Sequence, residues 1–333
     1  MRRALIVGID HYASTPLQGC VADAQSVADV LSRNADGSRN WSAELLVSTE
    51  VGGSKITRDV LRGELTKLFA TPRDTDLLFY FAGHGGQSPW GADLVTQDFK
   101  THSLGVSMND VLTLANDSNA RSVTLILDCC FSGDTGNPPG LQSAGVEEAF
   151  RLGKTLLREN VTVLAASRST ETAAELDGHG VFTHALLDGL EGGATDHLGK
   201  ITALGLYEHI SPSFDAWEQR PVLKTSMTEP LVLRLGPPWL DTALLRDLPR
   251  YFPTENFRFA LTRAHEGGGR PFPPGAVGTV EQQEFDYLGR LRNANLVTND
   301  GQRDHFWVAM EGGEVYLTAL GRYFWRLAAQ ELL

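Results

Sequence analysis

Two reactive side chains, His84 and Cys130, follow two strongly apolar segments of the sequence. His84 lies in Gly83-His84-Gly85-Gly86, just past the segment 76–81, and Cys130 lies just past the segment 123–127. A thiolate can attack a carbonyl carbon, and an imidazole can carry the proton that a leaving amine needs. The glycines beside His84, Gly85 among them, leave room for a substrate backbone to bind closely. The pair therefore predicts acyl-transfer chemistry.

Both residues must be held by elements that bring them to one place. Short apolar segments predict buried strands at 4–9, 45–48, 76–81, 123–127, 161–165 and 221–224, with 231–235 pairing nearby. Intervening stretches predict helices at 21–31, 56–69, 106–115, 182–190 and 201–210. This alternation is typical of an α/β domain with a mainly parallel sheet and helices on both faces. Because the carboxyl ends of parallel strands gather at one edge, His84 and Cys130 are expected to meet there.

The composition and the pattern of predicted strands change at Gly236-Pro237-Pro238, which divides residues 1–235 from residues 236–333. The second part is expected to be a small α+β domain. Its pattern predicts a helix at 281–293, a β-hairpin formed by 296–298 and 305–310, and a closing helix at 318–332. A helix, a two-stranded wing and a final helix resemble a winged-helix module.

The amino-acid composition limits which partners and which cell compartment we expect for the protein. The chain of 333 residues has a net charge of −12, which disfavours nonspecific binding to nucleic acid or anionic membranes. Residues 239–333 hold ten Arg and no Lys against twelve acidic residues, which is not the basic footprint of a DNA-binding module. Three cysteines cannot form a disulfide framework, and the apolar start is too short for a signal peptide. We expect a cytoplasmic protein without membrane or nucleic-acid partners, whose C-terminal part contacts another protein.

Four strings in this order resemble motifs of metacaspases and bacterial caspase-like peptidases. They are Leu17-Gln18-Gly19-Cys20-Val21-Ala22-Asp23-Ala24, Phe79-Tyr80-Phe81-Ala82-Gly83-His84-Gly85, Leu127-Asp128-Cys129-Cys130-Phe131-Ser132-Gly133 and Gly180-Val181-Phe182-Thr183-His184-Ala185-Leu186. The resemblance covers about residues 4–235 and implies a caspase-like fold and thiol-protease activity on protein substrates. In that pattern Cys130 is the nucleophile and His84 is its partner, while Cys129 points into the packing of the sheet. Their separation is close to the roughly 50 residues typical of caspases.

Two acidic residues carry the specificity that the resemblance implies. In metacaspases the positions of Asp23 and Asp128 form a pocket for the side chain of Arg or Lys. Carboxylates at the floor of a partly dry pocket bind a guanidinium strongly and repel an acidic side chain. Ordinary roles are also open, as a solvated helix residue for Asp23 and as a capping residue for Asp128. The chain departs from the family pattern at Ala82, often Ser, and at Phe131, more often His.

Other candidates rest on weaker patterns. Ser167 follows the predicted strand at 161–165 and is a candidate for contact with the substrate backbone, or simply the first residue of a helix. Many metacaspases need calcium that is held by clustered aspartates. The spacing of the candidate ligands does not match such a site: Asp93, Asp98, Asp110 and Asp134. We therefore expect no metal and no other cofactor.

The segment after Cys130 is a candidate for autocleavage. Residues 132–145 are rich in Gly, Pro, Ser and Asn and predict an accessible loop. Arg151, Lys154 and Arg158 follow this loop and match the basic specificity expected from the acidic pair. A solvated helix across 147–158 is the alternative interpretation.

Three functions are open from the sequence. The first is an active endopeptidase that cuts after Arg or Lys and is activated by a signal, in a bacterial stress or defence pathway as the resemblance implies. The second is a catalytically silent caspase-like adaptor, against which the presence of all four motif residues argues. The third is a winged-helix transcription regulator, which the acidic start of the predicted helix at 281–293 disfavours. We favour the first.

Overall fold

The computed structural model describes residues 1–48, 55–88, 91–100, 103–130, 156–166, 175–176, 179–214, 221–266 and 278–333. The chain divides into two compact units, Met1–Pro237 and Pro238–Leu333. Each unit has its own sheet and its own helices, and the two are described separately.

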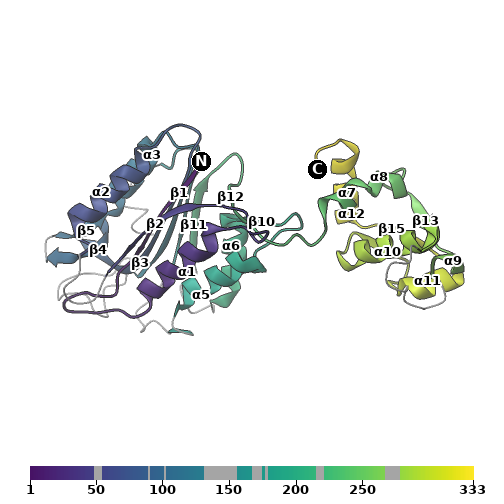
Figure 1. The fold of residues 1–333 in the computed structure, drawn as a ribbon, viewed down its shortest axis with the longest axis horizontal. Helices are drawn as coiled ribbons and strands as arrows, with labels where there is room; N and C mark the ends of the chain where they lie inside the picture. The colour runs from purple at the N-terminus through teal and green to yellow at the C-terminus, as the bar shows by residue number, and fades with distance from the viewer. Residues whose placement is uncertain are drawn as a thin grey trace. The chain divides into compact units, whose positions relative to one another are not determined.

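A mainly parallel sheet forms the centre of the first unit (Figure 1). Its strands are β1 (Arg2–Gly8), β2 (Ser42–Val47), β3 (Asp76–Ser88), β6 (Ser122–Cys130), β7 (Val161–Ala165) and β11 (Val222–Ser226), in the spatial order β11-β7-β6-β3-β1-β2. All neighbours are parallel except β11, which runs antiparallel to β7. The central strands are apolar on both faces, as a sheet covered on both sides requires. The expected mainly parallel sheet is confirmed.

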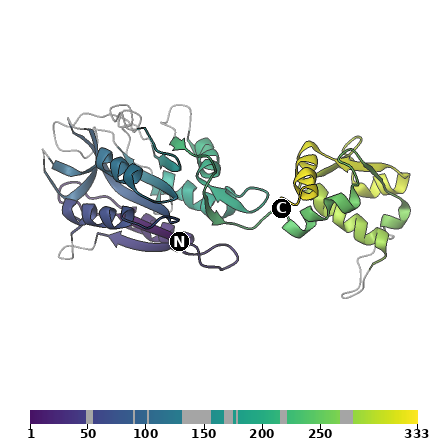
Figure 2. The same ribbon diagram turned by 90° about the horizontal axis from the view of Figure 1, so that it is seen from above.

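Helices cover both faces of this sheet (Figures 1 and 2). α2 (Arg58–Phe69) and α3 (Met108–Asp117) pack on the face that carries Leu5 and Val7. α1 (Cys20–Ser32), α5 (Val181–Asp188) and α6 (Ala203–Ile210) pack on the opposite face, with Ala4 and Ile6. Because side chains alternate between faces along a strand, successive residues of β1 belong to two different cores.

Strand β3 extends further than its apolar segment predicts. It continues to Ser88, pairs with β4 (Gly91–Lys100), and β4 pairs with β5 (Ser103–Ser107). The expectation that the two reactive residues follow their strands is therefore wrong: His84 lies inside β3, and Cys130 is the last residue of β6. Pairing with β4 occupies the backbone of a glycine-rich segment that has few side chains to mark it as a strand. The helix expected from residue 106 begins only at Met108, because β5 precedes it.

Smaller pairings complete the first unit. β10 (Lys200–Thr202) pairs antiparallel with β12 (Val232–Leu235) outside the main sheet. β8 (Glu175–Leu176) pairs with β9 (His179–Gly180), directly before α5. The short turns η1 (Gly189–Gly193) and η2 (Ser211–Ser213) follow α5 and α6.

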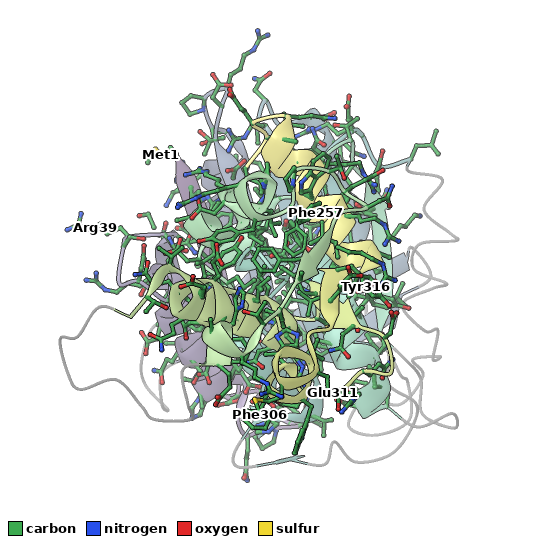
Figure 3. All side chains as sticks on the ribbon, turned by 90° about the vertical axis from the view of Figure 1, so that its right-hand side faces the viewer. Met1, Arg39, Phe257, Phe306, Glu311 and Tyr316 are labelled. Atoms are coloured by element: carbon green, nitrogen blue, oxygen red, sulfur yellow. The ribbon has the colours of Figure 1, made fainter. Side chains whose placement is uncertain are left out.

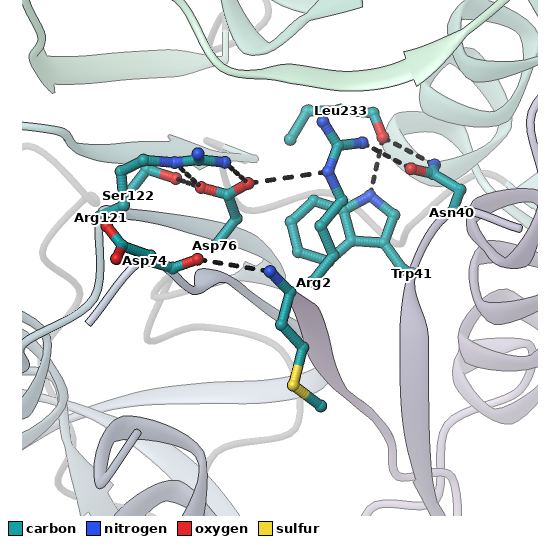
Figure 4. Close-up of polar contacts among 9 residues, drawn as sticks. Arg2, Asn40, Trp41, Asp74, Asp76, Arg121, Ser122 and Leu233 are labelled. Carbon is teal, nitrogen blue, oxygen red and sulfur yellow. Dashed lines mark hydrogen bonds and ion pairs between the residues drawn. The ribbon is translucent and has the colours of Figure 1, made fainter. Parts of the chain in front are cut away.

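A buried ion cluster anchors the amino ends of β3 and β6 (Figure 4). Asp76 is fully buried and accepts hydrogen bonds from Arg121 Nε at 2.9 Å and from Ser122 Oγ at 2.7 Å. Arg2 Nε lies 3.7 Å from the same carboxylate. Burial by itself would raise the pKa of Asp76, but the hydrogen bonds from Arg121 and Ser122 hold that pKa below its usual value. Because the cluster lies at the amino ends of these strands, it is structural.

Helices and a three-stranded antiparallel sheet form the second unit. The helices are α7 (Thr242–Arg246), α8 (Leu248–Tyr251), α9 (Arg263–Glu266), α10 (Val280–Asn293), α11 (His305–Glu311) and α12 (Ala319–Ala329). The sheet has the order β13-β15-β14, with bounds Arg258–Ala260, Glu314–Leu317 and Val297–Asn299 (Figure 3, where Tyr316 marks β15). In the described parts of both units, no helix is long and apolar enough to cross a bilayer.

The β-hairpin predicted for this unit is wrong. Residues 305–310 form helix α11, and β14 pairs with β15 instead. Asp304 caps α11 by accepting a hydrogen bond from the Phe306 N–H at 2.9 Å, and Gly312 ends the helix with a φ of 70°. The aromatic residues Phe306 and Trp307 favour strands, but these two capping signals prevail.

Candidate active site

His84 and Cys130 lie side by side on adjacent parallel strands. The register of β3 and β6 runs from Asp76 opposite Ser122 to His84 opposite Cys130. Both strands therefore bring these residues to the carboxyl edge of the sheet. This register pairs His84 and Cys130 through their backbones.

The imidazole of His84 is held by the loop that follows β1. Its Nε2 atom lies 2.8 Å from the backbone carbonyl oxygen of Thr15. A carbonyl oxygen can only accept a hydrogen bond, so Nε2 carries the proton and Nδ1 is the unprotonated nitrogen of the neutral ring. Burial lowers the pKa of His84, and the contact with Thr15 only partly offsets this effect. The ring is therefore neutral near pH 7, with Nδ1 as its basic atom.

Tyr12 fixes the backbone of His84 from the same loop. Its hydroxyl accepts a hydrogen bond from the His84 N–H at 3.1 Å and donates one to the Val95 carbonyl oxygen at 3.1 Å. The Tyr12 and His84 ring centroids are 4.6 Å apart. A Cβ atom on Gly83 would lie 2.7 Å from that hydroxyl, so glycine is required there. Sequence reasoning missed Tyr12; the signal that could have found it is an aromatic hydroxyl shortly after a core strand.

Asp23 and Asp128 form a buried acidic pair. Asp23, in the first turn of α1, is 2% exposed, and Asp128, in β6, is 8% exposed. The start of α5 reaches both: the Gly180 N–H donates to Asp23 Oδ2 at 3.5 Å, and Thr183 Oγ1 donates to Asp128 Oδ2 at 2.6 Å. Burial raises the pKa of Tyr80 well above its ordinary value, and Asp128 and Asp23 raise it further. Both carboxylates are thus close enough to act on one group, and Asp23 is not a solvated helix residue.

Asp10, which sequence reasoning also missed, caps α1 from outside the helix. Its carboxylate accepts hydrogen bonds from the first two N–H groups of α1 at 2.8 Å and 3.2 Å. The preceding residue, Gly19, has a φ of 96° and no side chain to do so. Burial, followed by the nearby carboxylates of Asp128, Asp10 and Asp23, raises the pKa of Cys20 well above its usual value. Its thiol is protonated near pH 7, so Cys20 is a poor nucleophile.

Three further candidates, Ser167, Arg151 and Lys154, fall outside the described residues. Gly85 pairs with Leu94 between β3 and β4.

The aspartates considered for calcium are engaged by other groups or not described. Asp98 accepts hydrogen bonds from the Arg58 N–H at 2.9 Å and from Thr96 Oγ1 at 2.7 Å. Asp110 lies 3.7 Å from the guanidinium of Arg62. Within the described ranges, no group of three or more His, Cys, Asp or Glu side chains is placed to hold a metal ion. Asp134 falls outside the described residues.

Arg158 is bound to the end of α3. Its guanidinium donates to the carbonyl oxygens of Ala115 at 3.3 Å and Ala120 at 2.9 Å, and to Ser118 Oγ at 3.0 Å. The last carbonyl groups of a helix lack partners within the helix, so this contact caps α3. A peptide bond after Arg158 can enter a protease cleft only if that cap opens.

Known proteins resemble the first unit. A family profile described as a caspase domain matches residues 1–232. Metacaspase-1 of Emericella nidulans is 24% identical over 159 residues, which is 43% of this chain and 38% of the relative. Metacaspase-1A of Aspergillus terreus is 27% identical over 157 residues, again 43% of this chain and 38% of the relative. The match thus spans well under half of the length of these relatives.

Solved structures also match. A protein of Geobacter sulfurreducens is 18% identical with a TM-score of 0.48, covering 71% of this chain and 97% of that chain. Caspase-1 of Spodoptera frugiperda is 10% identical with a TM-score of 0.44, covering 71% of this chain and 90% of that chain. The family profile alone spans more than half of the sequence. On that match, the chain belongs to the caspase-domain family of peptidases.

Proposed function

We propose that the chain is a cysteine endopeptidase in which Cys130 attacks the substrate and His84 moves the proton. The pairing of His84, inside β3, with Cys130, the last residue of β6, is the observation that carries this proposal. His84 Nδ1 accepts the thiol proton, and the thiolate attacks the carbonyl carbon to form a thioester. The same proton then leaves with the departing amine, and water hydrolyses the thioester.

We propose further that the enzyme cuts after Arg or Lys. Two buried carboxylates, Asp23 and Asp128, support this preference because a buried acidic pair gains most from a cationic partner. The mechanism uses no metal and no other cofactor, since the protein side chains supply both the nucleophile and the base. The proposed setting, a signal-activated stress or defence pathway in the bacterial cytoplasm, rests on the family resemblance.

A panel of fluorogenic peptides tests this function. Peptides that differ only in the residue before the cut should be cleaved after Arg and Lys and not after Asp. Addition of EDTA should leave the rates unchanged, whereas a calcium requirement would contradict the metal-free mechanism. A folded chain that cuts none of the peptides, while still binding a protein partner, would be the silent adaptor instead.

We propose that the second unit binds a protein partner. A groove of about 300 Å³ lies beside strand β13, lined by Arg250, Tyr251, Pro253, Phe257, Phe259, Ala260 and Glu284. Within the described residues, Glu284 is 3.3 Å from His265, whereas Arg250 has no ion pair and lies over the ring of Tyr251. An aromatic groove with one unpaired cation fits an extended segment that carries an acidic residue beside apolar ones. The winged-helix likeness stays a proposal, supported by the sheet after α10 and weakened by helix α11 at the place of the wing.

A substitution at the edge of strand β13 tests whether the second unit binds this partner. The Leu261 N–H bonds to the Gly313 carbonyl oxygen, so Phe259 and Leu261 face β15, while Arg258 and Ala260 turn their backbone outward. Peptides selected from a random library against the full chain should lose binding to Ala260→Pro, which removes one outward N–H at an edge position that tolerates proline. Equal binding to wild type and variant, or no selected peptide, would contradict the proposal.

A further inference from the structure

Hydrogen bonds connect three buried side chains, Tyr80, Thr183 and Asp128, in that order. The Tyr80 hydroxyl lies 2.6 Å from Thr183 Oγ1, and Thr183 Oγ1 donates to Asp128 Oδ2 at 2.6 Å. Tyr80 and Thr183 are fully buried, and Asp128 is nearly so. Thr183 has one hydroxyl proton, which it gives to Asp128, so Tyr80 must donate to Thr183. Both hydrogen bonds therefore point toward the carboxylate.

The three hydrogen-bonded residues come from three elements of the candidate site, β3, β6 and α5. Tyr80 lies in β3, four residues before His84, and Asp128 lies in β6, two residues before Cys130. Thr183 lies in the first turn of α5, whose preceding Gly180 N–H also reaches Asp23. The amino end of a helix stabilises negative charge, so the start of α5 favours both carboxylates. The hydroxyl of Thr183, which is itself held by Tyr80, contributes to the orientation of the Asp128 carboxylate.

We propose that Thr183 and Tyr80 are positioning residues for basic specificity, an inference that rests on the proposed function. They act through Asp128 and do not touch the substrate. A carboxylate held in one orientation suits the planar fork of a guanidinium better than the compact ammonium of Lys. The wild-type enzyme should therefore prefer Arg to Lys before the cut.

Kinetics of the full chain on three matched peptides test the inference. The peptides carry Arg, Lys or citrulline, the uncharged analogue of Arg, before the cut. Thr183→Val should lower kcat/KM for the Arg peptide about tenfold, mainly through KM, and leave the citrulline peptide nearly unchanged. Thr183→Ser, which keeps the hydroxyl, should restore most of the preference. Tyr80→Phe should cause a smaller loss in the same direction.

Thr162→Val is the matched control. Thr162 is also buried, and its hydroxyl lies 2.7 Å from Thr225 Oγ1, near the amino end of β7. This variant should keep the wild-type preference among the three peptides.

Equal losses for Arg and citrulline peptides in Thr183→Val would show a purely structural role and overturn the inference. An unchanged preference of Thr183→Val for the Arg peptide over the citrulline peptide would also overturn the inference. If Thr183→Val does not fold, Tyr80→Phe decides by the same comparison. Wild-type protein that cuts peptides without preferring Arg or Lys to citrulline would instead refute the proposed function.

Discussion

The proton on His84 Nε2 is placed by a backbone carbonyl group, that of Thr15. A carbonyl oxygen has no charge to lose or gain, so this contact holds the same tautomer at every pH at which the ring is neutral. An aspartate in that position would hold the ring as well, but it would also raise the histidine pKa. Here burial lowers the pKa of His84, which keeps Nδ1 unprotonated. In the proposed mechanism, His84 Nδ1 is therefore able to accept a proton before a substrate binds.

Substitution of the two adjacent cysteines separates their roles. Cys130→Ala should abolish peptide cleavage, because it removes the proposed nucleophile and the neighbouring thiol, Cys129, is buried. Cys129 is buried in the core under the sheet, so Cys129→Ala should keep most activity and lower the free energy of unfolding by about 1 kcal/mol. Activity and thermal unfolding of both purified variants measure this. Equal loss of activity in two folded variants would remove the assignment of Cys130.

Gly83 offers a second test at this scale. Gly83→Ala places a methyl group 2.7 Å from the Tyr12 hydroxyl and 3.1 Å from the Phe81 ring, so the hydrogen bond that fixes the His84 backbone must shift. We expect kcat to fall about 100-fold, the usual cost of a displaced catalytic group. Gly63→Ala is the control, since its Cβ meets nothing within 4 Å on helix α2. That variant should keep full activity; a similar loss in both would contradict the role of Gly83.

At the scale of elements, two adjacent strands, one loop and the start of one helix together form the candidate site. β3 and β6 deliver His84 and Cys130, while the loop after β1 provides the contacts of Tyr12 and Thr15. The start of α5 provides the hydrogen bonds to the acidic pair. The candidate cleavage positions Arg151, Lys154 and Arg158 lie in the sequence segment between β6 and α5.

Autocleavage in that segment should avoid Arg158. Because Arg158 caps α3, we expect wild-type protein to be cut after Arg151 or Lys154, which leaves the cap on the downstream fragment. Intact-mass spectrometry should show a fragment that begins at Leu152 or Thr155, and none in Cys130→Ala. Full-length wild-type protein that cuts peptides would show that activation does not require cleavage. A cut after Arg158 would show that the cap opens.

At the scale of the whole molecule, each unit contains groups whose pKa values in the folded state link its stability to pH. In the first unit the depressed pKa of Asp76 means that its stabilising contribution is present above the unfolded value of about 3.9 and is lost only below it. In the second unit His305 is buried, and within the described residues neither ring nitrogen has a hydrogen-bond partner. Burial, with Arg292 nearby, lowers the pKa of His305 to about 4.

His305 should therefore lower the stability of the second unit as the pH falls, and His84, whose pKa burial also lowers, acts in the same direction in the first unit. A folded pKa of about 4 below an unfolded value of about 6.5 means that the loss begins near pH 6.5 and grows down to pH 4. The total is of order 3 kcal/mol. Hydrogen exchange of the amides in β14 and β15 at pH 7 and pH 4.5 measures this loss of stability. The variant His305→Leu should show most of the stability difference between the two pH values abolished. The same pH dependence in that variant would assign the effect to another group.

The sequence alone determined the periodic apolar pattern, and with it the parallel sheet, its helices and the family likeness. Each of these depends on residues that are close in the chain, such as the apolar segment 123–127 or the alternation along β1. The two errors differ in origin: the glycine-rich extension of β3 is decided by its partner strand β4, whereas helix α11 is set by the capping residues Asp304 and Gly312, which lie next to it in the sequence.

Only the tertiary structure decided what surrounds the candidate site. Tyr12 is 72 residues from His84, Thr183 is 55 residues from Asp128, and Arg158 reaches Ala115 across 43 residues. Tyr12 has only the weak local signal of an aromatic hydroxyl after a core strand, and the partners of both residues are chosen by how strands and helices pack. Burial has the same origin: the surroundings that lower the pKa of His84 and raise that of Cys20 exist only once both faces of the sheet are covered.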